Sequence, residues 1–210
     1  MIRTRFLLFA ACLLATGAAN AQFTQLWTAI YPDSPGGIDE AYAVARDARG
    51  NTYVSGKSTS TTTGADYVTI KYSPTGQRLW DRAYTGVGGD REDVPSAIAV
   101  DNDGNCYVTG RSQGTDNLFE MATIKLRSSD GLIIEEVRES TLAGYDYYAT
   151  DIALSADGNV YITGYREDGV VPIQAQSQQY VTVRYGPTSR FRQALTGLQF
   201  TIGQPATTGE

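Results

Sequence analysis

The chain has 210 residues, of which 41% are hydrophobic and 19% are charged, and its formal net charge is −6. This length suits one substantial domain or a short repeat array. Lysines and arginines occur singly among acidic residues and form no basic patch, so we expect no nucleic-acid partner. The absence of histidine excludes His-ligated metals and catalytic triads built on an imidazole.

Residues 1–21 are expected to form a signal peptide. Two arginines precede the apolar run Phe6–Ala15, which is too short to span a bilayer, and Ala19-Asn20-Ala21 fits a cleavage site. We therefore expect cleavage between Ala21 and Gln22. The product is secreted to the periplasm, the cell surface or the medium, with no transmembrane segment in the mature chain. A lipoprotein signal ending at Cys12 is the less favoured alternative, because its apolar region is short.

Residues 22–195 contain three copies of one unit. The glycines of its first block, Gly50, Gly104 and Gly158, lie 54 residues apart. A second block, of the Val-Thr-Ile-Lys type, follows each first block, and copy three carries a five-residue insertion within Tyr165–Gln179. A period near 50 residues is the sequence signature of a propeller blade. Residues 196–210 lack repeat character and are expected to be an irregular tail.

Each unit is expected to contain four short strands. Strand one is of the Ala-Ile-Ala-Val type, and an Asp-x-x-Gly-Asn turn leads to strand two, since Gly, Asp and Asn favour tight turns. Strand three is the second block, and strand four contains Leu-Trp. Strand four is predicted at Leu79–Tyr84, in degenerate form at Leu132–Arg138, and without its Trp at Phe191–Leu195. Leu26–Tyr31 matches a strand four detached from its blade.

Strand one is predicted to be buried on both faces. Ala97 and Ala99 lie on one face and Ile98 on the other, so neither face is polar. One such unit leaves too much apolar surface in water to be stable alone, so the units are expected to stack side by side.

These repeated blocks resemble the bacterial SBBP family of seven-bladed β-propeller repeats. The likeness covers about residues 24–190 and is strongest over Asp90–Gly110, which contains Gly-Asn-x-Tyr-Val-Thr-Gly. The resemblance implies secreted or cell-surface propellers, without catalytic residues that could be transferred to this chain.

The chain departs from the family in having only three full copies, whereas propellers typically close with about 4–8 blades. The predicted fold is all-β: tandem four-stranded antiparallel blades that form a partial, open propeller of about three blades. Such an arc could self-associate through its open blade faces.

Five sets of residues were weighed as sites, and for each the structural interpretation is favoured. Asp101, Asp103 and Asn105 resemble part of a calcium loop but lack its glycine and glutamate positions, so a hairpin turn is expected. The acidic group Asp90, Glu92 and Asp93 recurs as Asp39 and Glu40 and as Asp146, which indicates an inter-blade loop role instead of glycosidase chemistry. The recurring cations, the tryptophans and the lone cysteine of the mature chain are expected to be structural: Lys71, Lys125, Arg184, Trp27, Trp80 and Cys106.

The insertion in copy three is the best local candidate for a binding loop, because it is unique to one copy: Val171, Pro172, Gln174, Gln176 and Gln178. No catalytic, cofactor-binding or metal-ligating residue is assigned, and no cofactor is expected. The favoured function is a secreted, non-catalytic scaffold for an unknown protein or glycan ligand. The alternatives are a secreted carbohydrate-active enzyme or quinoprotein-like propeller, and a truncated fragment of a longer propeller without independent function.

Overall fold

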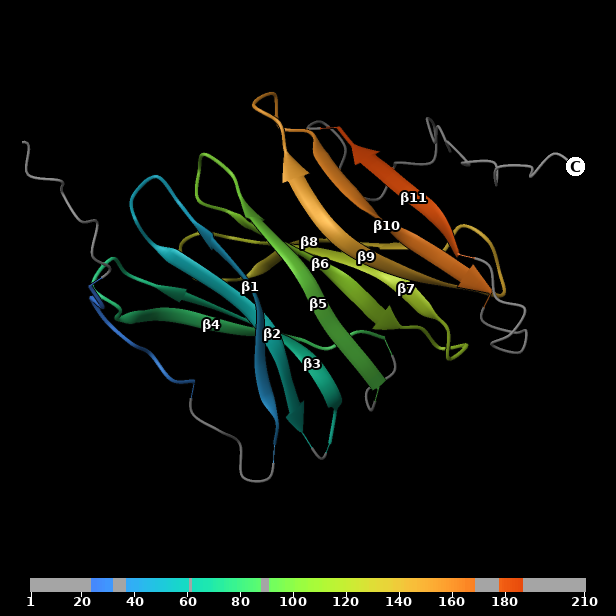
Figure 1. Ribbon diagram of the computed structural model, residues 1–210, viewed down its shortest axis with the longest axis horizontal. Coiled ribbons are helices and arrows are strands. Elements are labelled where there is room, and N and C mark those ends of the chain that lie inside the picture. The colour runs from blue at the N-terminus through green and yellow to red at the C-terminus, as the bar shows by residue number, and fades with distance from the viewer. Residues whose placement is uncertain (1–23, 32–36, 61, 88–90, 169–177, 187–210) are drawn as a thin grey trace, which may run out of the picture.

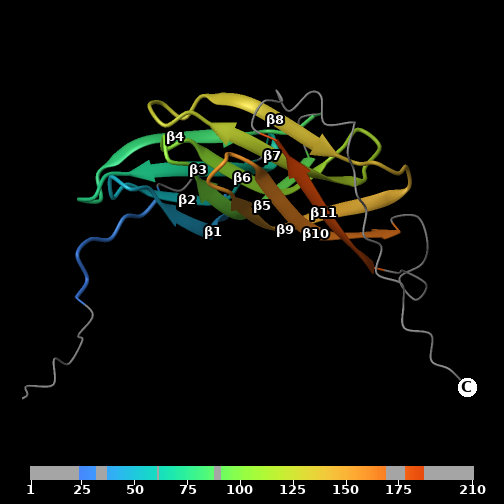
Figure 2. The same cartoon turned by 90° about the horizontal axis from the view of Figure 1, so that it is seen from above.

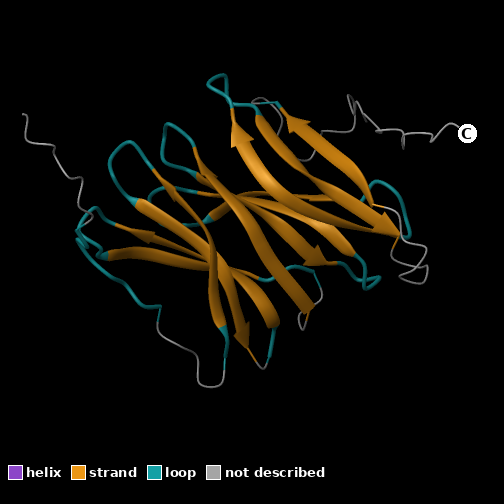
Figure 3. Cartoon of the chain, in the orientation of Figure 1, coloured by secondary structure: helices purple, strands orange, loops and turns teal. Residues whose placement is uncertain are grey.

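The computed structural model describes residues 24–31, 37–60, 62–87, 91–168 and 178–186, which contain eleven strands and no helix (Figures 1 and 3). The first unit, blade 1, consists of β1 (Asp39–Arg46), β2 (Thr52–Ser60), β3 (Gly64–Tyr72) and β4 (Arg78–Tyr84). Blade 2 consists of β5 (Arg91–Val100), β6 (Cys106–Gln113), β7 (Phe119–Leu126) and β8 (Ile133–Glu139). Blade 3 consists of β9 (Tyr145–Leu154), β10 (Val160–Asp168) and β11 (Gln178–Tyr185).

Strands that follow one another within a blade pair antiparallel. The described strand pairing between blades 1 and 2 is a short parallel one of β3 with β5, at Gly64↔Arg91 and Ala65↔Glu92. The sheets do not close on one another, so the prediction of an all-β, open partial propeller is confirmed. In Figure 2 the first strands β1, β5 and β9 lie along one side of the arc, and β4 and β8 lie along the other.

The fourth strand expected for blade 3 at Phe191–Leu195 lies outside the described residues, as do the signal peptide and the tail at residues 196–210. Within the part of the chain that is described, blade 3 is a three-stranded sheet in the order β11-β10-β9. No helix among the described residues is long and apolar enough to cross a membrane.

The turn between strands one and two forms as its sequence predicts. Gly50, Gly104 and Gly158 have φ angles of 87°, 84° and 82°, which glycine adopts without the steric cost that a Cβ would add. The N–H of Gly104 donates to the carbonyl of Asp101 at 3.0 Å, and the same contact closes the other two turns. One turn type therefore sets the register of all three blades.

Two apolar cores lie between successive blades. The first inter-blade core joins blades 1 and 2 and includes the fully buried Tyr53, Cys106 and Leu126. The second joins blades 2 and 3 and includes Met121, Ile152 and Ile162. Burial raises the pKa of the Cys106 thiol well above its usual value, so this cysteine is buried and inert, as expected.

The prediction that strand one is buried on both faces holds in blade 2 and is wrong in blade 1. In β5, Ala97 belongs to the second inter-blade core while Ile98 packs against the first. In β1, the equivalent Val44 is 68% exposed. Burial of this strand comes from the preceding blade, and no described strand lies on that side of β1.

Leu26–Tyr31 forms no strand, contrary to its resemblance to strand four. The segment lies against blade 1, where Trp27 and Tyr31 pack on Val68, Ile70 and Tyr72. A strand needs a neighbouring ladder, and this segment contacts a sheet face instead of a strand edge.

Strand two of each blade contains a glycine where strand one bulges toward it: Gly56, Gly110 and Gly164. A Cβ at Gly110 would overlap the carbonyl oxygen of Val94 and the hydroxyl of Tyr67. The bulge brings backbone so close that only glycine fits.

Replacing Gly110 with alanine is expected to lower the free energy of unfolding by about 1–3 kcal/mol, because the added methyl group must push the backbone of β5 away. The measurement is urea-induced unfolding followed by circular dichroism. Gly186→Ala is the matched control, since among the described residues a Cβ there would meet Asn159 at 3.9 Å, an ordinary contact. Equal effects of the two substitutions would contradict the explanation.

Candidate functional site

A recurring layer of side chains lies on the face that each blade turns toward the next one. In blade 1, the ammonium of Lys71 lies 4.9 Å from the centre of the Tyr53 ring and donates to the carbonyl of Ser128 at 2.8 Å. Lys125 lies over Tyr107 in blade 2, and Arg184 over Tyr161 in blade 3. The recurring cations are thus paired with tyrosine rings, and Lys71 also bonds a backbone carbonyl, so their predicted structural role is supported.

Trp80 packs between blades 1 and 2. It is 9% exposed, its ring lies edge-on to Tyr53 at 5.9 Å, and its indole N–H donates to the carbonyl of Ser128 at 3.0 Å. Gly131, at φ 69°, leaves room for the ring. Trp80 is therefore part of the inter-blade packing, as predicted.

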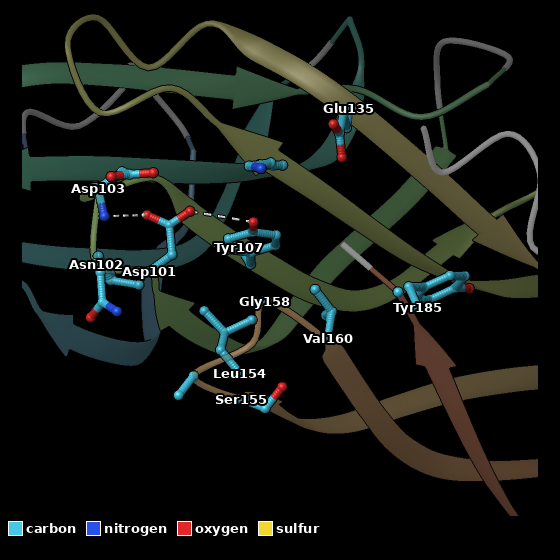
Figure 4. A pocket seen from close by; sticks show the side chains of 14 residues that line it. Asp101, Asn102, Asp103, Tyr107, Glu135, Leu154, Ser155, Gly158, Val160 and Tyr185 are labelled. Atoms are coloured by element: carbon cyan, nitrogen blue, oxygen red, sulfur yellow. Dashed lines mark hydrogen bonds between the residues drawn. The ribbon is translucent and has the colours of Figure 1, made fainter. Parts of the chain in front are cut away.

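The equivalent position between blades 2 and 3 is Glu135, because it lies opposite Lys125 as Trp80 lies opposite Lys71. A groove of about 520 Å³ opens there, shown in Figure 4. It is lined by the turn Asp101–Asp103, by Tyr107, Lys125 and Glu135 of blade 2, and by blade 3 residues that include Leu154, Ser155, Val160 and Tyr185. A smaller hollow of about 440 Å³ lies at the equivalent place between blades 1 and 2, where Trp80 is part of its lining. The replacement of the tryptophan by a glutamate thus coincides with the larger and more acidic of the two grooves.

The charge of the groove is mainly negative. Asp101, Asp103 and Glu135 contribute three carboxylates and Lys125 one ammonium. Burial opposes the charge on Lys125, but its hydrogen bond to Tyr107 and the nearby Glu135 and Asp101 carboxylates outweigh burial and raise the pKa of its ammonium. The lysine therefore remains charged at neutral pH, and the groove keeps an excess of acidic groups.

The Asp101 carboxylate is occupied within its own turn. It accepts hydrogen bonds from the backbone N–H groups of Asp103 and Asn105, at 3.0 and 2.8 Å, and from the Asn105 amide and the Tyr107 hydroxyl. Asp47 makes the same contacts with Asn51 and Tyr53 in blade 1. The predicted hairpin-turn role is confirmed by these contacts. Asp103 is exposed, and it bonds Asp101 through its backbone N–H and not through its carboxylate.

The recurring acidic group serves the junctions between blades. Asp93 is fully buried and accepts hydrogen bonds from the Ser112 hydroxyl and, at 2.7 Å, from the Gly86 N–H, while Glu92 pairs with Arg111. Asp146 accepts the Phe119 N–H at 2.7 Å. A glycosidase needs two carboxyl groups that reach one substrate bond, and the burial of Asp93 is unsuited to that role. Asp90 lies outside the described residues.

In blade 1, Glu40 pairs with Lys57 at 3.0 Å, whereas the two carboxylate oxygens of Asp39 are buried without a hydrogen bond among the described residues. Asp39 stands opposite Ser58 as Asp93 stands opposite Ser112. Blade 1 therefore has an aspartate at the position that Asp93 takes in blade 2.

The insertion proposed as a binding loop lies almost wholly outside the described residues, which include only Gln178 of its five named members. Gln178 begins β11, and its amide donates to Glu167 at 3.1 Å. A hollow of about 550 Å³ on this outer face of blade 3 is lined by Thr150, Thr163, Tyr165, Gln178 and Tyr180 among others. The groove at Glu135 was not predicted. The loss of Trp from the degenerate Leu132–Arg138 block was the one signal that could have revealed it.

The fold described so far defines an open arc of β-propeller blades. The family model described as "SBBP: Beta-propeller repeat" matches residues 82–119, which run from the end of β4 to the first residue of β7. The chain therefore contains an SBBP β-propeller repeat, and the predicted family resemblance is confirmed over this segment.

A crystal structure of a protein of unknown function from Bacteroides caccae is similar to this chain at 13% sequence identity, with a TM-score of 0.28. The match covers 65% of this chain and 59% of that one, so the chain spans less than two thirds of the protein it matches. No curated protein matches the sequence. Neither result bears on function.

The turn carboxylate Asp47 predicts a specific acid sensitivity. Burial opposes its ionisation, but hydrogen bonds from Asn51 and Tyr53 outweigh burial and lower the pKa of the Asp47 carboxyl below its ordinary value. A lowered pKa in the folded state stabilises the fold above the ordinary carboxyl pKa, and this contribution is lost as the pH falls through the folded value.

We expect Asp47→Asn to lower the free energy of unfolding at pH 7 by about 1–3 kcal/mol, with the difference from the unsubstituted protein shrinking below about pH 4. Denaturant unfolding at pH 7, 5 and 3 measures this. The exposed Asp116→Asn serves as the control and should show no such convergence. A pH-independent difference for Asp47→Asn would show that its charge is not responsible.

Proposed function

We propose that this is a secreted, non-catalytic scaffold protein that binds a protein ligand. Basic side chains of the ligand would enter the acidic groove between blades 2 and 3. The observation that carries the proposal is the Glu135 position, where a glutamate lining the groove stands in the place that Trp80 takes between blades 1 and 2. A concave site with a few convergent charged groups is the usual form of a binding site.

The acidic lining favours a cationic partner over other classes. The exposed Asp103 carboxylate and the half-buried Glu135 carboxylate can pair with lysine or arginine side chains, and complementary charge speeds and orients association. The net charge of −6 acts in the same direction. An anionic ligand would have to overcome both.

A glycan is the second ligand class, and the aromatic residues of the groove disfavour it. Sugars are commonly bound against exposed aromatic faces, but Tyr107 and Tyr185 are only 6% and 2% exposed. Their hydroxyls are also engaged, that of Tyr107 by Asp101 and that of Tyr185 by Glu139. The groove therefore offers carboxylates to a ligand and little stacking surface.

The enzyme alternative has less support. The carboxylate of Asp101 is held by its own turn and that of Asp93 is buried, so neither is placed to transfer a proton to a ligand in the groove. The third alternative is a fragment of a longer propeller that has no function of its own. The geometry of the groove neither favours nor disfavours it.

A binding titration tests the proposal with hexa-arginine as the probe and hexa-glutamate as its charge-reversed counterpart. We expect hexa-arginine alone to bind, with an affinity that falls as salt is raised, because exposed charge pairs are screened. Glu135→Trp, which removes a carboxylate from the groove and places there the bulky residue found between blades 1 and 2, is expected to weaken binding more than tenfold.

Asp103→Asn removes one exposed carboxylate and should weaken binding by about 0.2–1 kcal/mol. Asp116→Asn removes the same charge from the β6–β7 turn, at the other end of β6, and should leave affinity unchanged within error. Affinity that is insensitive to Glu135→Trp would contradict the proposed site, and binding of neutral oligosaccharides in place of the peptide would favour the glycan class.

A further inference from the structure

The outer face of blade 3 repeats a set of side chains that is buried in the other two blades. In blade 1, Tyr53, Ser55, Tyr67 and Thr69 are 0% exposed and Lys71 is 5% exposed beneath blade 2. In blade 3, the equivalent Tyr161 is 38% exposed and Tyr180 is 85% exposed, and Thr163, Thr182 and Arg184 are exposed as well. This face thus has the composition of an inter-blade interface while no described strand covers it.

The open face of blade 1 has the complementary property. In blade 2, the face that packs against blade 1 is apolar. The equivalent positions of blade 1 are Val44, Val54, Val68, Ile70 and Tyr72. Residues 24–31 cover part of this face, so Val68, Ile70 and Tyr72 are 6–8% exposed. The rest is open, since Val44 is 68% exposed and a hollow of about 310 Å³ lies over the blade 1 face. The two uncovered faces lie at opposite ends of the arc (Figure 1).

We propose that two copies of this chain associate head to tail, with the outer face of blade 3 of each copy packed on the open face of blade 1 of the other. The interfaces within the chain supply the pattern of contacts. Tyr53 donates to the carbonyl of Gly104 at 2.8 Å, and Lys71 donates to that of Ser128. The repeat places Tyr161 opposite the Gly50 carbonyl, and Arg184 opposite the Pro74 carbonyl, of the second copy.

Residues 24–31 extend this interface. Trp27 contacts Gly76 of blade 1 in the way that Trp80 contacts Gly131 of blade 2. Tyr31 likewise lies near Asp81, and its equivalent Tyr84 donates its hydroxyl to Glu136 at 2.8 Å. The segment therefore occupies the place, relative to blade 1, that the fourth strand of a preceding blade would occupy. In the assembly that preceding blade is blade 3 of the second copy, whose described edge strand is β11.

The register of this added strand follows from blade 1. Thr69 of β3 lies opposite Arg82 of β4, and the repeat makes Thr182 equivalent to Thr69 and Ala29 equivalent to Arg82. Ala29 of one copy is thus placed opposite Thr182 of the other, and residues 24–31 complete a four-stranded blade.

The number of copies follows from closure. Two three-bladed arcs give six blades, within the range of about 4–8 at which propellers close, whereas three arcs would give nine. A two-fold ring also leaves no open face, because each copy uses both of its faces. This assembly is independent of ligand binding in the groove, and either can fail without the other.

Light scattering on the purified protein over a range of concentrations tests the proposal, and we expect the mass of a dimer. Tyr180→Arg places a charge in the docking face and is expected to raise the dimer dissociation constant at least tenfold, with an unchanged circular dichroism spectrum because the side chain is 85% exposed. Tyr180→Met is the matched control and should remain dimeric, because Met121 occupies this position under blade 3 at 1% exposure.

Val44→Arg should dissociate the dimer in the same way from the opposite face. A mixture of Tyr180→Arg and Val44→Arg proteins should recover dimers, because one copy keeps an intact blade 1 face and the other an intact blade 3 face. A monomer at all concentrations, or a Val44→Arg protein that remains dimeric, would overturn the head-to-tail arrangement.

A disulfide tests the strand register. With Ala29→Cys and Thr182→Cys in one chain, mild oxidation is expected to yield a covalent dimer on a non-reducing gel, since residues opposite each other on paired strands have closely spaced Cβ atoms. Ala29→Cys with Thr150→Cys, on β9, is the control and should give little cross-linking. An equal yield from both pairs would overturn the proposed exchange of residues 24–31.

Discussion

Side-by-side stacking of blade faces is the constraint on which this structure depends. Each blade is a thin sheet with apolar residues on both faces, so it can be stable only when another surface covers each face. The contacts between blades are also polar in a regular way, because tyrosine hydroxyls and a lysine reach across to backbone carbonyls of the next blade. These hydrogen bonds satisfy polar groups inside a largely apolar interface, which fixes the relative position of neighbouring blades.

The backbone connection between blades is slight by comparison. Blades 1 and 2 share only two paired residues on each strand, between β3 and β5. The arrangement of the arc is therefore set by side chains, and substitutions at single interface positions change what lies between two blades. Glu135 is such a substitution: the blades around it keep their fold, and a groove opens between them.

Much of this fold could be predicted from the sequence, because its determinants are local and repeated. The turn glycines at 50, 104 and 158 and the alternating strand patterns identify the strands and their order. The exposure of Val44 could not be predicted, because burial of a first strand depends on a preceding blade and not on its own residues. The extended but unpaired state of residues 24–31 has the same origin, since strand formation needs a neighbouring edge.

The groove was beyond sequence analysis for a different reason. It becomes visible only when Glu135 is aligned with Trp80 through strand pairing, and the degenerate block between residues 132 and 138 obscures that alignment. The Asp101 turn, in contrast, was interpreted from sequence because, among the described residues, every hydrogen bond to its carboxylate comes from a residue at most six positions along the chain. Contacts within one turn could be predicted from the sequence, whereas a groove between two blades could not.

The position of Cys106 has a practical consequence. This thiol is completely enclosed by blades 1 and 2, and it is the one free cysteine of the described residues. A reagent can reach it only when these two blades separate or unfold, so its rate of modification measures how often the arc opens at that joint. The molecule thus carries an internal probe of how often blades 1 and 2 separate.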